Sequence, residues 1–292
     1  MRFFSTLIDG LSLGSIYAII ALGYTMVYGI AKMLNFAHGD VIMVGAYAAI
    51  VGAMTLAFPP ILAIIFSIVV CAVLGFSIEK IAYKPLRKSS SLAVLITAIG
   101  VSYFLQSVAQ LIFGSTMMQF PKLIDIEPIH ITENLVVSGA SLITLLCAGI
   151  IMISLTLFVN KTKTGRAMLA VSEDKDAARL MGINVNRTIS ITFIIGSSLA
   201  AIAGMCYGLT YSFISPVTGS MPGIKAFVAA VLGGIGSIPG AMLGGIILGL
   251  IENFAKAYIS PQLSDAIVFA VLIIVLLLKP TGILGKQRHE KV

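Results

Sequence analysis

Three polar stretches of this 292-residue sequence carry residue types that can bind a ligand or a partner. They are residues 35–40, residues 161–187 and the glycine-rich residues 233–242. The sequence has no HExxH metal motif, no GxxxxGK[ST] phosphate-binding loop and no carboxylate pair beside a plausible base. We therefore predict no catalytic residue, no metal site and no resident cofactor, and any use of ATP would require separate nucleotide-binding subunits.

The stretch 161–187 has the signals of a short capped helix rather than of a plain linker. Ser172 can cap a helix whose first turn holds Glu173 and Asp174 near the positive helix end, and Gly182 can close it in a left-handed conformation. The predicted helix has about ten residues, which is too short to be stable alone.

This short helix presents Ala177, Ala178 and Met181 on one side. Because the helix needs something to pack against, we expect a partner protein on the same side of the membrane to cover it. An ordinary capped surface helix is the alternative interpretation.

The stretch Asn35-Phe36-Ala37-His38-Gly39-Asp40 lies between two apolar runs. Polar groups beside the membrane interior are costly and are often functional. Asn35 can cap the helix that follows, with His38 and Asp40 near its positive end or lining an aqueous vestibule. For His38 a structural, hydrogen-bonded role is favoured over substrate contact or proton relay.

The glycine-rich stretch predicts short, broken helices that turn near residues 236–240 in close contact with their neighbours. No strand precedes it, so phosphate binding by a GxGxxG loop is excluded by context, and packing through small residues is the better explanation. Together with Asn35, His38 and Asp40, we expect it to shape a pathway through the membrane. The residues concerned are Gly233, Gly234, Gly236, Pro239 and Gly240.

The amino-acid composition indicates whether these stretches belong to a water-soluble protein or to a membrane protein. Hydrophobic residues make up 58% of the chain and charged residues only 11%, whereas soluble domains have about a quarter charged. The net charge of +7 does not indicate nucleic acid, because the basic residues lie in the gaps between apolar runs. Nor does the start of the chain show a cleavage pattern, so we expect no removable signal peptide.

The apolar runs predict an all-α, polytopic bundle in one membrane domain, residues 1–292, surrounded by membrane lipid. About 8–9 membrane segments are expected, some of them broken or re-entrant. The runs are 7–30, 41–58, 61–81, 92–113, 138–159, 189–213, a glycine-rich pair within 221–258, and 266–278.

Charges in the gaps set the orientation. Three basic gaps are expected in the cytoplasm, among them the loop 160–188, and the acidic loop 114–137 is expected outside. Counting crossings from these gaps places the N-terminus outside. The basic residues are Lys80, Lys84, Arg87 and Lys88, then Lys161, Lys163, Arg166, Lys175, Arg179 and Arg187, and finally Lys279, Lys286, Arg288 and Lys291; the external loop holds Lys122, Asp125, Glu127 and Glu133.

Four long stretches resemble the branched-chain amino acid ABC transporter permeases of the LivH type, in the same order as in that family. They are LNFAHGDVIMVGAYAA at 34–49, TGRAMLAVSEDKDAARLMGI at 164–183, KAFVAAVLGGIGSIPGAMLGG at 225–245 and KPTGILG at 279–285. Within the second, Asp176-Ala177-Ala178 and Gly182 resemble the EAA loop of importer permeases, with Asp in place of Glu at its first position.

This resemblance implies a bacterial inner-membrane importer made of several chains. A second permease of the LivM type, two ABC ATPase subunits and a periplasmic amino-acid-binding protein would complete it, and leucine, isoleucine and valine would be its substrates. The loop would form the coupling helix that transmits ATPase closure to the bundle. The coupling residues would be Arg166, Glu173, Asp174, Asp176, Ala177, Ala178 and Gly182.

Two other functions stay open. Members of the same family also move urea and short amides, so the substrate is less firmly predicted than the mechanism. A secondary transporter without an ATPase would be expected to hold an ionisable residue in the middle of the membrane. Glu252 and Lys256 can pair along one helix face, but we expect them near its external end.

Overall fold

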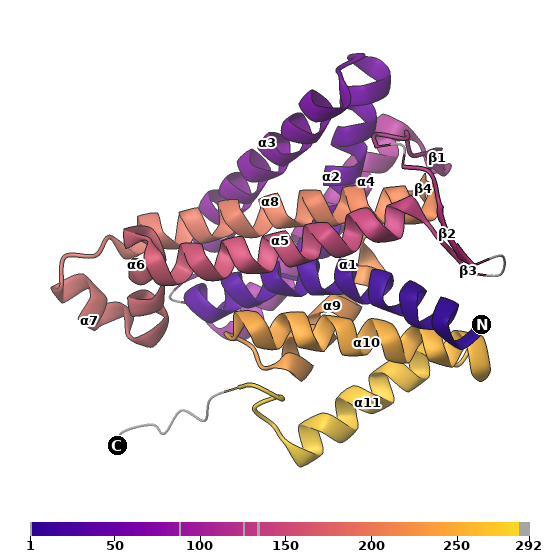
Figure 1. The fold of residues 1–292 in the computed structure, drawn as a ribbon. Helices are drawn as coiled ribbons and strands as arrows, with labels where there is room; N and C mark the ends of the chain where they lie inside the picture. The colour runs from indigo at the N-terminus through magenta and orange to yellow at the C-terminus, as the bar shows by residue number, and fades with distance from the viewer. Residues whose placement is uncertain (1, 88, 125, 133–134, 286–292) are drawn as a thin grey trace.

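The computed structural model describes residues 2–87, 89–124, 126–132 and 135–285, and these form a bundle of long helices (Figure 1). Lys88, Asp125, Glu133, Lys286, Arg288 and Lys291, which entered the orientation argument, lie outside the described residues. The helices are α1 (Arg2–Ala31), α2 (His38–Ile50), α3 (Pro60–Ile78), α4 (Ser91–Phe113), α5 (Gly139–Lys161), α6 (Lys163–Glu173), α7 (Lys175–Leu180), α8 (Val185–Tyr211), α9 (Ser220–Gly233), α10 (Ile238–Tyr258) and α11 (Ser264–Leu278).

The predicted apolar runs correspond to helices in the structure. α2 and α3 each end in a π-helical turn, Val51–Thr55 and Glu79–Tyr83 respectively. Among the described residues, seven helices are long and apolar enough to cross a bilayer, and α9 and α11 are shorter apolar helices. The all-α, polytopic prediction is therefore confirmed. The glycine-rich run does form the pair α9 and α10, but α10 is a continuous helix of 21 residues rather than a short, broken one.

Four short strands within the loops were not predicted. β1 (Met118–Gln119) pairs antiparallel with β4 (Phe213–Ile214), and β2 (Ile129–Thr132) pairs with β3 (Leu135–Val137). The first pair ties the loop after α4 to the end of α8. In Figure 1 the strands and the start of α1 lie at one end of the bundle, which we call the strand end, and α6 and α7 lie at the other, the α7 end.

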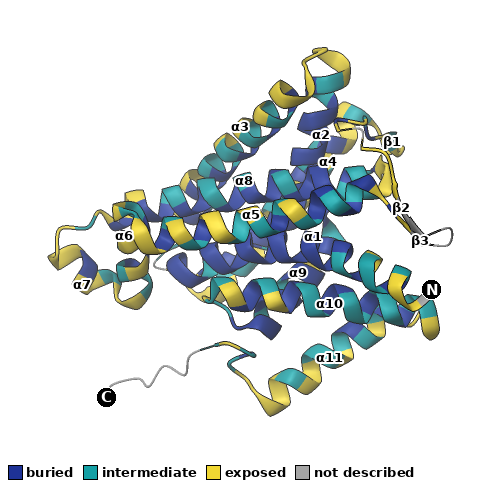
Figure 2. Ribbon diagram, in the orientation of Figure 1, coloured by how far each residue is buried: buried dark blue, intermediate teal, exposed yellow. Residues whose placement is uncertain are grey.

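Burial separates central helices from peripheral ones. The most apolar 18-residue window of α1 is 94% buried inside the chain, whereas those of α4 and α5 are each 22% buried. Figure 2 shows α1 buried along much of its length and exposed residues spread over α3, α5 and α11. α1 is thus the central element of the bundle.

α1 packs most closely on α10 through glycines. A side chain at Gly14 or Gly249 would overlap the backbone of the other helix, and one at Gly245 would overlap Ala18. Small residues at such positions let two backbones approach in a membrane, where packing rather than water drives association.

Two helices begin inside the bundle rather than at its surface. The His38 ring lies against Gly23 of α1, about 12 Å before the end of that helix at Ala31. The first residues of α2 and α9 also meet there, because Gly39 contacts Gly219 and Gly223. Irregular backbone is tolerated at membrane depth where protein surrounds it, and the segments that lead into these two helices, residues 32–37 and 215–219, reach the inside of the bundle, which was not predicted for them.

Candidate functional site

The loop between α5 and α8 folds as two helices rather than the single helix predicted. Thr162 caps α6 by accepting a hydrogen bond from the Gly165 amide at 2.9 Å, while the Ser172 hydroxyl donates to the Leu169 carbonyl inside that helix. Ser172 is therefore not the cap we predicted. Thr162, which follows the last membrane-depth residues of α5, begins a helix earlier than Ser172 can.

Asp174 is the cap of α7 instead of a residue in its first turn. Its carboxylate accepts from the amides of Asp176 at 2.8 Å and Ala177 at 3.0 Å, and these bonds lower the pKa of the Asp174 carboxyl. Gly182 has φ of 80°, so the predicted left-handed close is present.

The surface of α7 differs from the one predicted. Ala177 is exposed, but Ala178 is buried, so it packs on the chain itself and not on a partner. Leu180 is 90% exposed and Met181 is 82% exposed. The exposed apolar side chains at the end of this helix are therefore Leu180 and, one residue beyond it, Met181, with Arg166, Glu173, Asp174 and Asp176 exposed nearby in sequence.

Polar contacts anchor α7 and its neighbours to the bundle. The Lys175 ammonium donates to the Ala31 carbonyl at the end of α1, at 2.8 Å. Buried Glu79 forms an ion pair with Arg87 and accepts from the Ser190 hydroxyl at 2.7 Å. Sequence reasoning missed Glu79, although a lone acid beside four basic residues was a visible signal.

Asn35 and His38 each contact a tyrosine of the same chain. The Tyr83 hydroxyl donates to Asn35 Oδ1 at 2.9 Å. The N-cap of α2 is Ala37, not Asn35, and it forms no side-chain capping hydrogen bond. The prediction that Asn35 caps α2 is wrong, because its side-chain oxygen accepts from Tyr83 in the π-helical turn that follows α3. His38 is buried edge-on against the Tyr24 ring, with centroids 4.7 Å apart.

Asp40 joins the starts of α2 and α9. The Gln106 amide on α4 donates to Asp40 Oδ1 at 2.9 Å and to the Ser220 hydroxyl at 3.1 Å. Asp40 is 1% exposed, and it sits where the positive ends of two helices converge. Gln106 was not predicted, since nothing in a helical run marks which polar residue faces inward.

The glycine turn lies at the opposite end of α9. Gly234 and Gly236 have φ of 105° and 96°, values open to glycine, and Ser237 caps α10 by accepting from the Gly240 amide at 3.2 Å. The chain's last described segment pairs with this turn, because Ile283 and Leu284 donate to the carbonyls of Leu232 and Gly233.

The two groups of pathway residues do not meet. Asp40 lies at the start of α9 and the glycine turn at its end, so α9 connects them. The turn lines a cavity of about 860 Å³ at the α7 end, together with parts of α1, α5 and α6. Its lining includes Gly236, Pro239, Thr25, Lys32 and Glu173.

A buried ion cluster surrounds Glu252. Glu252 is only 1% exposed, and its carboxylate accepts from Lys225 at 2.7 Å, from Lys256 at 2.6 Å and from the Tyr17 hydroxyl at 2.8 Å. Lys225 also pairs with Asp265 of α11 at 2.7 Å. The predicted Glu252–Lys256 pair exists, but Glu252 is enclosed by α1, α9 and α10 rather than extended toward a membrane surface.

The spacing of Gly10, Ser12 and Gly14 matches the GxSxG of hydrolases, yet it lies inside the continuous helix α1. A nucleophile elbow requires a sharp strand-to-helix turn. Among the described residues there is also no group of three potential metal ligands. The spacing therefore gives no argument for catalysis.

The fold is that of a multi-pass bundle of membrane-spanning helices. A family described as "Branched-chain amino acid transport system / permease component" matches residues 6–276, and the chain belongs to this family. The chain is thus a transport permease component.

Relatives match it end to end. The high-affinity branched-chain amino acid transport system permease proteins LivH of Escherichia coli K12 and BraD of Pseudomonas aeruginosa are each 44% identical, over 100% of this chain and 98% of theirs. A probable LivH of Methanocaldococcus jannaschii is 29% identical over 93% of this chain and 89% of its own length. PsaBC from Streptococcus pneumoniae in complex with Fab has a TM-score of 0.50 at 15% identity, covering 96% of this chain and 93% of that chain, which is a likeness of fold alone.

Proposed function

We propose that this chain forms half of the translocation pathway of an ATP-driven importer for branched-chain amino acids, with leucine, isoleucine and valine as substrates. The observation that carries the coupling part is α7, a capped six-residue helix that ends in Leu180 and is followed by Met181, both of them almost fully exposed. The full-length identity to LivH and BraD supports the substrate class.

The coupling argument rests on how α7 is built. A helix of six residues is too short to be stable by itself, and here its start is fixed by Asp174 and its close by Gly182. Two exposed apolar side chains on such a helix favour a protein partner over water. We assign that partner as the ATPase, and we place α7 in the cytoplasm because the neighbouring segments are basic.

Movement of α7 has a direct path into the bundle. Lys175 of α7 contacts the end of α1, and α6 and the turn between α9 and α10 line the same cavity at the α7 end. Closure of the ATPases would shift these elements together and change which side of the membrane the pathway faces.

The same proposal names the other subunits. Two ABC ATPases would supply the nucleotide sites, a periplasmic amino-acid-binding protein would deliver substrate, and a second, LivM-type permease would complete the pathway. A cavity bounded by one chain at the α7 end is consistent with a pathway that a second permease completes.

The buried Lys225–Glu252 pair is the feature that a secondary transporter would be expected to have. Its charges are already matched within the chain, since Lys256, Asp265 and Tyr17 contact the pair. A neutral, fully partnered cluster is better suited to fixing helices than to carrying an ion, so the ATP-driven importer remains the better proposal.

Replacing Leu180 and Met181 together by Asp tests the coupling, because charges there would oppose burial in a partner groove. We expect the ATPases to be lost from the purified complex and ATP-dependent leucine uptake into vesicles to stop. Met117→Asp, at a 72% exposed position of the loop after α4 that lines neither the cavity nor the glycine turn, is the control. ATPases that stay bound to the Asp variant, with uptake continuing, would contradict the assignment.

Uptake of each candidate substrate into vesicles tests the second part of the proposal. The complete complex is expected to accumulate leucine, isoleucine and valine when ATP is present inside the vesicles. Accumulation of urea or a short amide in their place would identify a different substrate class while leaving the coupling result unaffected.

A further inference from the structure

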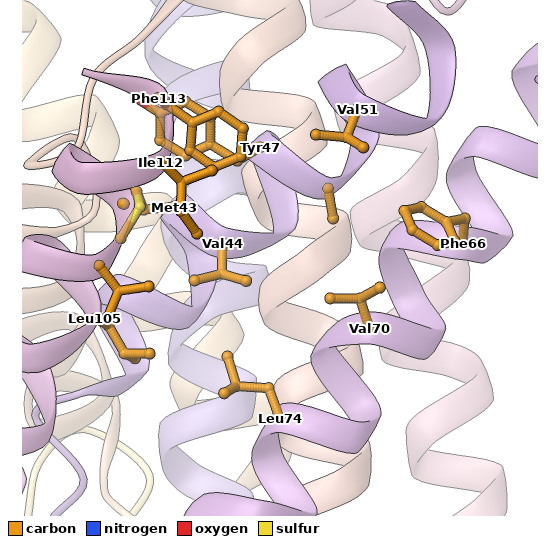
Figure 3. Close-up of a pocket in the computed structure, with 13 residues that line it drawn as sticks. Met43, Val44, Tyr47, Val51, Phe66, Val70, Leu74, Leu105, Ile112 and Phe113 are labelled. Carbon is orange, nitrogen blue, oxygen red and sulfur yellow. The ribbon is translucent and has the colours of Figure 1, made fainter. Parts of the chain in front are cut away.

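An apolar cavity of about 340 Å³ lies among α2, α3 and α4, apart from α7 and from the glycine turn (Figure 3). Three helices supply its walls, and it takes no part in the sites described above. The side chains that define it here are Tyr47 of α2, Phe66, Val70 and Leu74 of α3, and Leu105 and Ile112 of α4.

The lining excludes a charged or zwitterionic ligand. The Tyr47 hydroxyl is the one oxygen that a lining side chain brings, and it has no hydrogen-bond partner in the described part of the chain. An amino acid would lose the hydration of its ammonium and carboxylate there without gaining any ionic partner, which is prohibitively costly. The occupant must therefore be a hydrocarbon.

The shape of the cavity matches a chain rather than a compact ligand. Phe66, Val70 and Leu74 recur every four residues and so follow one face of α3. This stripe extends for about 12 Å along the helix. Sticks from α4 face it across the cavity in Figure 3, with Leu105 and Ile112 at different heights.

The cavity is continuous with the membrane-facing surface. Ile112 on its lining is 67% exposed, and α3 and α4 are among the least buried spans, at 28% and 22%. Tyr47 stacks on Phe113, the last residue of α4, with centroids 4.3 Å apart. One end of the cavity therefore lies near the membrane surface at the strand end, and the other extends toward the bilayer interior.

We propose that this cavity binds one acyl chain of a membrane phospholipid, whose headgroup lies at the strand end. The lipid would fill the space between α3 and α4 that the chain's own side chains leave open. This inference depends on the chain spanning a membrane and not on the identity of the transported substrate.

The absence of tryptophan from the sequence allows a direct test. Ile112→Trp places a single reporter on the cavity lining, and Val73→Trp, at a 61% exposed position of α3 that does not line the cavity, is the matched control. The purified full chain in detergent is titrated with a phospholipid brominated on its acyl chains, which quenches tryptophan on contact.

Quenching of Ile112→Trp is expected to saturate at low lipid content, while that of Val73→Trp rises only in proportion to the lipid in the micelle. Adding Val70→Phe should raise the lipid content at half-saturation at least about fivefold, because it overfills the cavity. Parallel quenching of the two reporters would overturn the proposal.

A second experiment uses the unaltered chain, so its result does not depend on whether the variants fold. The assembled complex in nanodiscs is irradiated with a phospholipid carrying a photoactivatable group on its acyl chain, and adducts are mapped by mass spectrometry. Adducts on residues 66–74 and 105–112 that unlabelled lipid competes away support the proposal. Adducts confined to the outward face of α3 would mean that another protein chain covers the cavity, and this result would contradict the proposal.

Discussion

The effect of a buried charged residue on the stability of this bundle depends on how many of its charges and hydrogen-bonding groups have a partner. Glu252 receives two ammonium groups and a hydroxyl, and Lys225 lies between two carboxylates. In a low-dielectric interior such a cluster holds helices in register, but each member becomes costly once its partner is removed.

Replacing Glu252 by Gln is therefore expected to destabilise the protein by about 3 kcal/mol, because it leaves a buried ammonium short of its counter-charge. The measurement is thermal unfolding of the purified chain in detergent. Lys256→Gln removes the partner that is 38% exposed and should cost less than about 1 kcal/mol. Equal shifts for the two variants would show that burial does not set the energetics of the cluster.

Asp174 gives a second residue-scale prediction. Asp174→Ala removes the α7 cap and should weaken ATPase attachment, whereas Asp174→Asn keeps a capping oxygen and should preserve it. Co-purification of the ATPases at neutral pH measures both. An Asp174→Ala variant that retains its ATPases as well as Asp174→Asn does would contradict a role for the cap.

The pH dependence of this cap follows from the direction of the pKa shift. Since the pKa of Asp174 is lowered from its ordinary value of 3.8 by the amides it accepts from, its stabilising effect is present above that value and is lost as pH falls through the lowered pKa. Attachment should therefore be insensitive to mild acid.

Elements in this protein are placed by backbone contact as much as by side chains. α1 and α10 touch through Gly14, Gly245 and Gly249, and the starts of α2 and α9 touch through Gly39 and Gly219. Such contacts leave no room for a methyl group, so they fix helix spacing more strictly than a leucine-filled interface would.

Gly249→Ala should thus separate α1 from α10 and destabilise the chain by about 1–3 kcal/mol through overpacking. Gly100→Ala in α4 is the control, because a Cβ there meets nothing within 4 Å and alanine is the better helix former. Detergent-solubilised variants are compared by thermal unfolding. A Gly249→Ala variant as stable as Gly100→Ala would show that the helices can reposition freely.

At the scale of the whole molecule, the two ends of the bundle differ in charge and in structure. The strand end holds β1 to β4, and the α7 end holds the two helices of the coupling loop. Basic residues of the loop, such as Lys163 and Arg179, predict that the α7 end is cytoplasmic.

Cysteine labelling checks this orientation. In a background where Cys71, Cys147 and Cys206 are replaced by alanine, a membrane-impermeant maleimide applied to intact spheroplasts should label Met117→Cys and spare Leu180→Cys. Both positions are well exposed, at 72% and 90%, so accessibility within the fold does not bias the comparison. Labelling of Leu180→Cys in intact spheroplasts would show that the α7 end faces outward, which is opposite to the predicted orientation.

The sequence by itself determined the all-α class and the order of the apolar runs, because crossing a bilayer requires about 20 apolar residues and charges gather in the gaps. It left the number of crossings open, since about 8–9 segments were expected and seven full-length spans are found among the described residues. It also located the glycine turn and the left-handed close at Gly182, where backbone conformation dictates the residue. These features depend on neighbours in the chain, and so they are readable without coordinates.

Only the tertiary structure decided which polar residues pair and which faces are free. Glu252 meets Lys225 from another helix, Asp40 meets Gln106, and Ala178 is buried while Leu180 is not. Each of these contacts depends on how a helix is rotated about its axis and how deep it lies in the bundle. A helix that is apolar on every side has no polar face in its sequence from which its rotation or its depth could be predicted.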